Sequence, residues 1–255
     1  EIAMLAATLD EISGGRFNLG IAAGGAELLK WVNIAPERPL AETRNAIANI
    51  NAILGGGVVP GWTPEAYLRF TPRRRVPIYL GAMGPRMLAL AGEVADGVLP
   101  LLFPPEHFAT VRPLVEAGAA TAGRSIESID LAACIWVSLS SDAAAAEAAL
   151  RDKIAYYGAG LSPLILERLG VTKADFAPIE RAMMTERDPE KARALVTEKM
   201  LRIGVVGAAP DLIARLETLV AMGARHLSFG PPLGPDLLAA VEQLGQQVIP
   251  HFRRS

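Results

Sequence analysis

The chain has 255 residues, of which 51% are hydrophobic and 5% aromatic, and its formal net charge is −2. This size fits one α/β domain with an aliphatic core, and the balanced charge excludes electrostatic recruitment by nucleic acid or an anionic membrane. No apolar run in the sequence reaches the length of a membrane span. The single cysteine, Cys134, indicates a reducing compartment, so we expect a cytoplasmic protein with a small-molecule substrate.

The first elements predicted along the chain are a helix, a strand and a second helix. The opening helix has apolar residues at helical spacing, Phe17–Ala22 reads as a strand after a glycine turn, and Glu37–Leu54 reads as a helix ended by glycines. An inward-facing apolar stripe is expected on each helix. It contains Ile2, Leu5, Leu9 and Ile12 in the first helix and Leu40, Ile47, Ile50 and Leu54 in the second.

The stretch Pro77–Pro100 predicts a complete strand–turn–helix–strand unit. Pro77–Leu80 and Val98–Leu102 are short apolar runs typical of buried parallel strands. Between them, Gly81–Gly84 form a small-residue turn, and Pro85 occupies the first helical position, where its fixed φ is favourable. The apolar face of this helix is expected to contain Met87, Leu90, Ala91 and Val94.

A turn of small residues before a helix suits an anion. It exposes free backbone N–H groups, and the positive end of the helix dipole favours negative charge, so the turn is a candidate phosphate site. The same glycines also fit a tight turn that binds nothing. On spacing alone, both interpretations stay open.

The second half of the chain continues the alternation. A helix over Glu106–Gly123 leads into a long apolar strand over Ile129–Leu139, and residues 140–202 read as short helices that begin at the capping residue Asp142. The remaining predicted elements are a helix over Pro210–Met222, a strand over His226–Phe229 and a helix over Asp236–Val248.

Strands separated by helices predict parallel pairing with right-handed crossovers. Five strands are predicted, near residues 17, 77, 98, 130 and 226, whereas a closed barrel of this type has eight. The sequence starts at Glu1, inside a helix that would normally follow a strand. We therefore expect the native protein to be longer at its N-terminus and to contain three further strands there.

Four segments in compatible order give the chain a resemblance to a known family. They are LDEISGGRFNLGIAAGG (9–25), VPIYLGAMGPRMLALAGEVADGVL (76–99), VVGAAPDLIARLETLVAMGARHLSFGPPLGPD (205–236) and LGQQVIPHF (244–252). Through them the chain resembles the bacterial-luciferase-like flavin and deazaflavin oxidoreductases. The pieces GPPLGPD and VIPHF are similar to the branch of 5,10-methylenetetrahydromethanopterin reductases.

This resemblance implies a single domain over residues 1–255, a (β/α)8 TIM barrel represented by its last five strands. Residues 140–202 would form a helical insertion between strands seven and eight. A cofactor would lie at the C-terminal mouth of the barrel, with its phosphate beside the glycine turn, and the protein would be a homodimer or homotetramer. The implied cofactor-binding residues are Ala23, Gly24 and Gly25 after strand four and Gly81, Ala82, Met83, Gly84 and Pro85 in the turn.

No catalytic residue transfers directly from the resemblance. Many relatives have an acid at the position of Gly25, and the nearest acid here is Glu27, a weak catalytic candidate whose alternative role is a solvated acid at a helix start. Trp136 is expected to wall the substrate pocket or, alternatively, to lie in the core. Pro231 and Pro232 are expected to line the same pocket or only to shape a turn.

Metal-dependent and nucleophilic chemistry find little support in the sequence. His107, His226 and His251 are dispersed and show no metal-ligand spacing. There is no nucleophile elbow, and Cys134 has no evident base partner. We therefore expect no metal.

Two charged clusters read as structural. Glu93 and Asp96 form an i,i+3 pair just before a strand, at the barrel face where residues serve stability. Arg73–Arg75 reads as a solvated loop, with contact to an anionic ligand tail as the alternative.

The function implied by the resemblance is hydride transfer. Reduced coenzyme F420 would give a hydride to a pterin that carries a one-carbon unit, or to a similar unsaturated substrate. An FMN-dependent monooxygenase stays open as an alternative, because the same barrel mouth accepts flavin. A catalytically silent protein that binds flavin or deazaflavin also stays open, because the acid is missing at Gly25.

Overall fold

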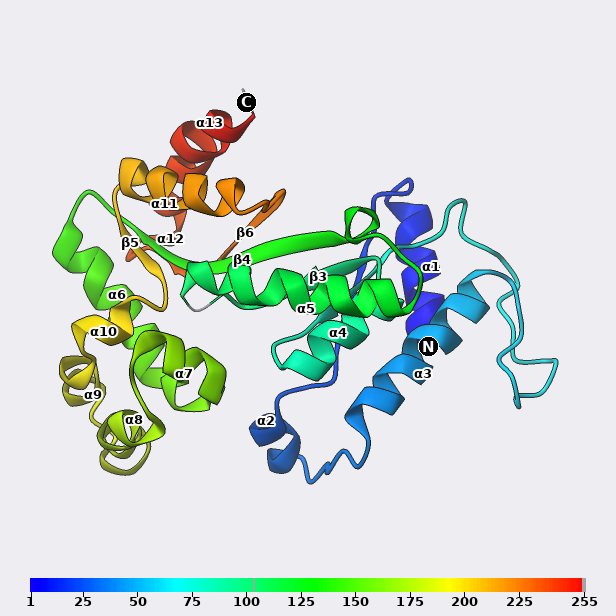
Figure 1. Cartoon of the computed structure of the whole chain (residues 1–255), viewed down its shortest axis with the longest axis horizontal. Helices are drawn as coiled ribbons and strands as arrows, with labels where there is room; N and C mark the ends of the chain where they lie inside the picture. The colour runs from blue at the N-terminus through cyan, green and yellow to red at the C-terminus, as the bar shows by residue number, and fades with distance from the viewer. Residues whose placement is uncertain (103, 254–255) are drawn as a thin grey trace. The chain divides into compact units, whose positions relative to one another are not determined.

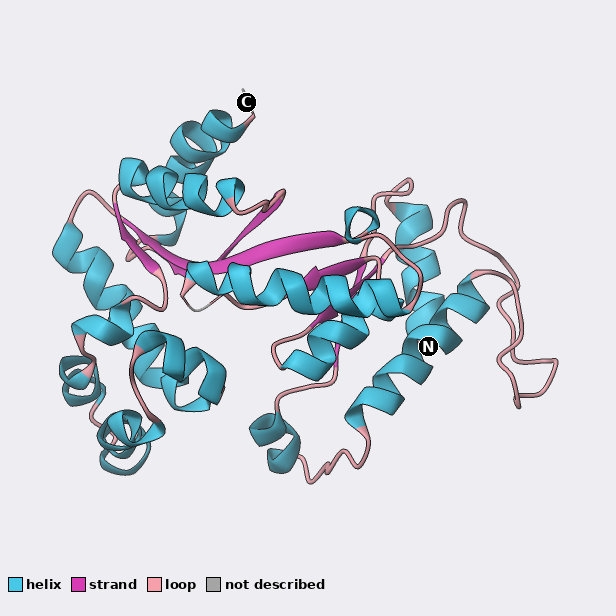
Figure 2. Cartoon of the chain, in the orientation of Figure 1, coloured by secondary structure: helices cyan, strands magenta, loops and turns pink. Residues whose placement is uncertain are grey.

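The computed structural model of the chain describes residues 1–102 and 104–253, except for the side chains of residues 26–28 (Figure 1). The chain folds into two compact units. Unit 1 comprises Glu1–Pro100 and Val111–Leu131, and unit 2 comprises Leu101–Thr110 and Ala132–Ser255. Both units combine helices with strands (Figure 2). Among the described residues, no helix has the length and apolar character needed to cross a bilayer.

The strands of unit 1 are parallel, and neighbours in the sheet are also neighbours along the chain. β1 (Leu19–Ala22) pairs with β2 (Ile78–Gly81), and β2 pairs with β3 (Gly97–Leu99). β3 pairs with the first residues of β4 (Asp130–Leu139). The four strands predicted for this part of the chain are therefore confirmed, with bounds that differ by a few residues.

The core of unit 1 is aliphatic. Ile78, Leu80 and Val98 of the strands and Leu88 of a helix are fully buried. The helices of this unit are α1 (Ile2–Ile12), α2 (Ala26–Trp31), α3 (Pro39–Leu54), α4 (Pro85–Val94), α5 (Phe108–Thr121), whose start belongs to unit 2, and the 3-10 turn η2 (Ile126–Ser128).

The predicted apolar face of α1 was wrong. Small and polar side chains form the buried face of this helix, whereas Ile2, Leu5, Leu9 and Ile12 are exposed. α1 lies beside α3, and alanines allow a closer approach of two helices than leucines do. The buried residues of α1 are Ala3, Ala6, Ala7 and Asp10.

Asp10 is buried because an arginine from a distant loop neutralises it. Its side chain is 1% exposed, and its Oδ1 accepts a hydrogen bond from Arg74 Nε at 3.1 Å. Arg74 also donates to the carbonyl of Phe17, while the neighbouring Arg75 pairs with Asp96. The prediction of a solvated loop was therefore wrong for Arg74, but it holds for Arg73 and Arg75, whose side chains are 82% and 63% exposed.

The predicted buried faces of α3 and α4 are confirmed in part. Of the α3 face, Ile47, Ile50 and Leu54 are buried. In α4, Leu90 and Ala91 are buried as predicted, but Met87 and Val94 are only half-buried and their places are taken by Leu88 and Gly92. The buried face is thus rotated slightly, because a glycine lies where α4 meets α5.

Two glycines let α4 and α5 come into backbone contact. A Cβ atom placed on Gly92 would overlap the carbonyl oxygen of Val115, and one placed on Gly118 would overlap the carbonyl oxygen of Ala89. Arg124 adds a hydrogen bond to the carbonyl of Gly92, at 3.1 Å. The crossing of these helices therefore leaves no room for a side chain at either glycine.

Unit 2 is built on the rest of β4, which pairs in parallel with two strands. β6 (His226–Leu233) runs beside β4 from Ala132 onward, and β5 (Val205–Gly207) pairs with the end of β4. β5 was not predicted, because three residues give no periodic pattern, and β6 is longer than the predicted strand. All pairings are parallel, which confirms the α/β class, and the described strands do not close into a barrel.

Helices make up most of unit 2. Seven helical segments connect β4 to β5: α6 (Ala143–Tyr157), η3 (Gly158–Gly160), α7 (Pro163–Leu169), α8 (Lys173–Glu180), η4 (Arg181–Glu186), α9 (Pro189–Leu195) and α10 (Glu198–Leu201). The others are η1 (Pro105–His107), α11 (Ala209–Ala221), α12 (Leu237–Gln243), η5 (Leu244–Val248) and α13 (Ile249–Phe252).

Most of the longer helices between β4 and β5 begin at a side-chain cap. The carboxylate of Asp142 accepts from the N–H of Ala145 at 3.1 Å, and that of Asp188 accepts from the N–H of Lys191 at 2.9 Å. The N–H and hydroxyl of Thr172 both donate to the carboxylate of Asp175. These contacts satisfy backbone groups at the helix starts with residues only a few positions away.

Candidate active site

The glycine turn of unit 1 is built as predicted. β2 ends at Gly81, and α4 begins at Pro85, with Gly84 as its N-cap in an extended conformation. Gly84 and Pro85 are exposed, and a Cβ atom placed on Gly84 would meet nothing within 4 Å. The N–H groups of the first helical turn have no acceptor inside the helix. The turn therefore presents open backbone and a helix N-terminus at its surface.

The register of the sheet brings the turn next to the end of β1. Gly81 pairs with Ala22 on one side and with Leu99 on the other, and the N–H of Ala82 donates to the Leu99 carbonyl at 3.4 Å. A Cβ atom on Gly81 would lie 3.2 Å from the Cβ of Ala22. Residues 23–25 follow β1 directly, so both predicted cofactor-binding segments leave neighbouring strands at their carboxyl ends, where α/β proteins bind ligands.

The segment after β1 contains a helix that the sequence did not predict. Gly24 has φ +86°, a conformation that favours glycine, and Gly25 is the N-cap of α2. Glu27 lies in α2, but its side chain is outside the described part of the structure. Its catalytic role stays a prediction.

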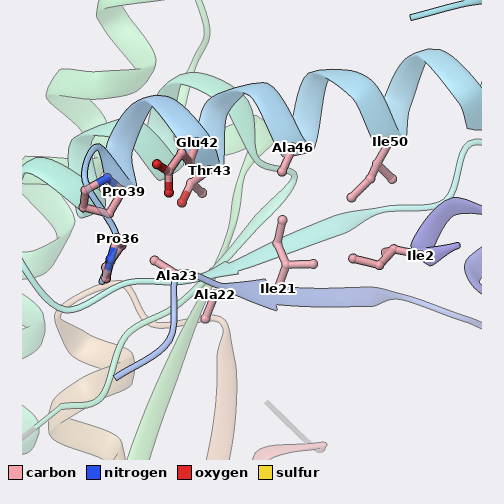
Figure 3. Close-up of a pocket in the computed structure, with 10 residues that line it drawn as sticks. All are labelled: Ile2, Ile21, Ala22, Ala23, Pro36, Pro39, Glu42, Thr43, Ala46 and Ile50. Carbon is pink, nitrogen blue, oxygen red and sulfur yellow. The ribbon is translucent and has the colours of Figure 1, made fainter. Parts of the chain in front are cut away.

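A small cavity borders the same strand end (Figure 3). Its volume is about 230 Å³, which is below the range of roughly 300–1,000 Å³ that is typical of ligand pockets. Figure 3 shows Glu42 and Thr43 of α3 near Ala23, with otherwise apolar neighbours. The sequence did not predict this cavity, because its walls come from three separate elements. They are Ile2, Ile21, Ala22, Ala23, Pro36, Pro39, Glu42, Thr43, Ala46 and Ile50.

In unit 2, the predicted pocket residues meet at the carboxyl ends of β4 and β6. Trp136 pairs with Gly230, and a Cβ atom on Gly230 would lie 2.9 Å from Cδ1 of the indole. Pro231 and Pro232 follow within β6, the first exposed and the second half-buried. Trp136 is 6% exposed, so its indole is largely covered.

Residues of α6 cover the indole of Trp136. The Nζ of Lys153 lies 5.2 Å from the centroid of the indole and 3.9 Å from that of the Tyr157 ring. The rings of Trp136 and Tyr157 meet edge to face at 6.1 Å. Burial lowers the pKa of Lys153. The only sequence signal for this cluster is the aromatic pair that ends an alanine-rich helix.

The other candidate side chains, Cys134, Glu93 and Asp96, are buried or paired within the protein. Burial raises the pKa of the Cys134 thiol, and a hydrogen bond from Ser228 opposes this only in part, which disfavours the thiolate. Glu93 pairs with Arg44, and Asp96 accepts a hydrogen bond from the N–H of Ile78 at 2.9 Å. In the described chain, no three His, Cys, Asp or Glu residues are grouped so as to hold a metal.

His107 provides a prediction on stability. It is 2% exposed, and burial together with the charge of Arg168 lowers its pKa below the ordinary 6.5. The folded state thus favours the neutral imidazole. Above pH 6.5 this histidine is neutral in both states and costs no stability. As the pH falls below 6.5, the unfolded chain takes up the proton first, so the free energy of unfolding decreases. We expect the urea midpoint to drop between pH 7.5 and pH 5.5.

The variant His107→Leu should show a smaller drop than the wild type over this range. Urea unfolding followed by circular dichroism measures both. Equal drops in wild type and His107→Leu would contradict the prediction.

Comparison with known proteins places these observations in context. Residues 1–226 match the family model described as luciferase-like monooxygenase. The chain is 33% identical to 5,10-methylenetetrahydromethanopterin reductase of Archaeoglobus fulgidus, over 96% of this chain and 76% of that protein. The enzyme of the same name from Methanolobus tindarius is 34% identical over 95% of this chain and 76% of its own length.

A solved structure of a related reductase is also similar to this chain in its fold. The coenzyme F420 dependent tetrahydromethanopterin reductase from Methanopyrus kandleri matches with a TM-score of 0.87 and 31% sequence identity. The match covers 98% of this chain and 78% of that structure.

Proposed function

Because this chain belongs to the luciferase-like monooxygenase family, we propose that it is an F420-dependent oxidoreductase. It transfers a hydride from reduced coenzyme F420 to a pterin that carries a one-carbon unit, or to a similar unsaturated acceptor. The observation that carries this proposal is the similarity to two 5,10-methylenetetrahydromethanopterin reductases along nearly the whole chain. The similar reductase from Methanopyrus kandleri depends on coenzyme F420, which supports the choice of cofactor.

The glycine turn of unit 1 fits the phosphate of such a cofactor. Gly84 has open space where a Cβ would be, and the helix that follows is long enough to present a dipole. Arg86, in the first turn of α4, is exposed and forms no ion pair among the described residues, so its charge is available to an anion. The protein backbone of residues 23–25, which follows the neighbouring strand β1, would lie along the cofactor.

In this reaction the protein binds the cofactor and the acceptor and orients them toward each other. The bound cofactor supplies the hydride, so the chain needs no strongly basic side chain at the reacting atoms. The turn at Gly81–Pro85 would fix one end of the cofactor. In unit 2, the exposed Pro231 and the half-buried Pro232 would line the acceptor pocket, whereas Trp136, which α6 largely covers, fits its alternative place in the core.

An FMN-dependent monooxygenase is the second candidate, since the description of the family model names monooxygenases. The two candidates differ in their cofactor and in their reaction with oxygen. Binding of F420 with micromolar affinity or better, much weaker binding of FMN, and a reduced complex that persists in air support the proposal. Purification with stoichiometric FMN, or rapid oxygen consumption after reduction, would support the monooxygenase.

The variant Gly84→Val tests the phosphate cradle. The Cβ atom of a branched side chain at this open position would meet no protein atom within 4 Å, and the side chain would block the approach of a phosphate. We expect F420 affinity to fall at least tenfold, which is about 1.4 kcal/mol, with little change in thermal stability. Fluorescence titration with F420 measures the affinity.

The matched control is Gly245→Val, at an exposed glycine that also has open space around it and lies outside the turn. It should bind F420 like the wild type. Asp96→Ala should lower stability with little effect on affinity, because Asp96 holds the start of β2. Equal affinity of wild type and Gly84→Val would leave the turn without a role in binding.

A further inference from the structure

The helix α1 of unit 1 turns its largest apolar side chains toward solvent. The opposite face of the helix consists mainly of alanines and is already buried within the unit, where α1 lies beside α3. Each of the large apolar side chains keeps between 45% and 77% of its surface exposed. They are Ile2, Met4, Leu5, Leu9 and Ile12. The described chain therefore covers the face with small side chains and leaves the face with large ones open.

The open face also lacks charge along most of its length. The exposed residues from Ile2 to Leu9 are apolar except for Thr8, whose hydroxyl donates to the carbonyl of Met4 at 2.9 Å. A helix that faces water normally has charged and polar side chains on that side. Charged residues are depleted at the centre of protein–protein interfaces. The composition of this face is therefore that of a contact surface.

The spacing of the branched side chains fits the contact line of two paired helices. Ile2, Leu5, Leu9 and Ile12 follow one another at intervals of three, four and three residues, which is the repeat of coiled coils. We call these four residues the α1 seam. Their order, Ile-Leu-Leu-Ile, reads the same from both ends. Two antiparallel copies of the helix would place Ile2 against Ile12 and Leu5 against Leu9.

The charges at the two ends of the α1 seam are complementary in that arrangement. Glu1 precedes the helix and is exposed, whereas Arg73 lies beside the other end, 4.0 Å from Glu11 and 82% exposed. An antiparallel partner brings the carboxylate of its own Glu1 toward the end where Arg73 lies. Exposed pairs of this kind contribute little affinity, but they help to fix the register of an interface.

We propose that two copies of this chain pair through the α1 seam, with their α1 helices antiparallel across a two-fold axis. Such a contact joins identical surfaces, so it closes as a dimer and does not extend into a filament. The seam forms the dry centre of the interface, and the charged ends lie in its rim. A stable dimer buries roughly 800 Å² per partner, so the surface of unit 1 that flanks α1 completes the contact.

The test is sedimentation equilibrium of the full chain over a wide range of concentrations. We expect the wild type to reach twice the mass of the chain as its concentration rises. Leu5→Glu places a carboxylate in the middle of the seam in both copies, and its burial should weaken association at least about a hundredfold. Because Leu5 is 58% exposed, the separate variant chain should keep the circular dichroism spectrum of the wild type.

Leu238→Glu is the matched control, because Leu238 is a leucine of α12 in unit 2 that is 76% exposed and lies outside the seam. It should associate like the wild type. The orientation is tested by disulfide formation in coexpressed Leu5→Cys and Leu9→Cys chains. These should cross-link to each other, whereas neither variant should cross-link when expressed alone. The wild type, which has Cys134, is the blank.

Three results would overturn the proposal. The first is a wild type that sediments as a monomer at every concentration. The second is Leu5→Glu associating as strongly as the wild type, or Leu238→Glu losing association to the same extent, since either would show that the α1 seam is not the contact. The third is a cross-link in Leu5→Cys expressed alone, which would exclude the antiparallel arrangement.

Discussion

Replacement of Arg74 by methionine is expected to lower the free energy of unfolding by about 3 kcal/mol, because it leaves a buried carboxylate without its partner. Asp10 is 1% exposed, and its Oδ2 already has no hydrogen-bond partner in the structure. Arg74 is itself 35% exposed, so water compensates part of the loss, and we place the effect at the lower end of the range for broken buried pairs.

The arginine run supplies its own control. Arg73→Met removes a charge that lies 4.0 Å from Glu11 with both groups exposed, and such surface pairs contribute little. The double variant Asp10→Leu, Arg74→Met should recover much of the stability, since it removes the unpaired carboxylate as well. Urea unfolding measures all three. Equal effects of Arg73→Met and Arg74→Met would show that the Asp10 pair contributes no more than a surface contact.

The second large effect is expected at Gly118. Alanine normally stabilises a helix relative to glycine by about 1 kcal/mol. At Gly118 the added methyl group would overlap the carbonyl of Ala89, and backbone cannot move aside as a flexible side chain can. We therefore expect Gly118→Ala to destabilise by about 3 kcal/mol, at the upper end for overpacking, and Gly118→Val to prevent folding.

The control is a glycine in a helical segment with free space around it. Gly245 is exposed, and a Cβ atom there would meet nothing within 4 Å. Gly245→Ala should leave stability unchanged or raise it slightly. Thermal unfolding of both variants tests the sign as well as the size. A Gly118→Ala protein as stable as the wild type would mean that α4 and α5 can separate at no cost.

Local signals are the part of the fold that the sequence predicts well. The predicted strand–turn–helix–strand segment from β2 to β3 is confirmed. Each of its boundaries is marked by a residue with one preferred backbone role, such as Pro85 at the first helical position. Asp142 and Asp236 mark helix starts in the same way. These signals act over a few residues and need no knowledge of the rest of the chain.

Features that depend on distant residues were missed or reversed. The buried face of α1 contradicts its hydrophobic pattern because Asp10 is neutralised by an arginine 64 residues away. β5 is too short to show a period. In the candidate site, Trp136 was predicted but Lys153 was not, since the two meet only when α6 packs against β4. Pairing across the sheet, not propensity, determines such neighbours.

Several helices between β4 and β5 are capped by a side chain at their own start, and this has an evolutionary consequence. Because caps such as Asp142 and Asp188 specify their own helix starts, one helix in this stretch can lengthen, shorten or be replaced without rewriting the others. Changes in connection length add only a slowly growing entropic cost. Lineages can therefore remodel what surrounds the strand ends, and with it the range of molecules accepted there, while the parallel sheet keeps its alignment.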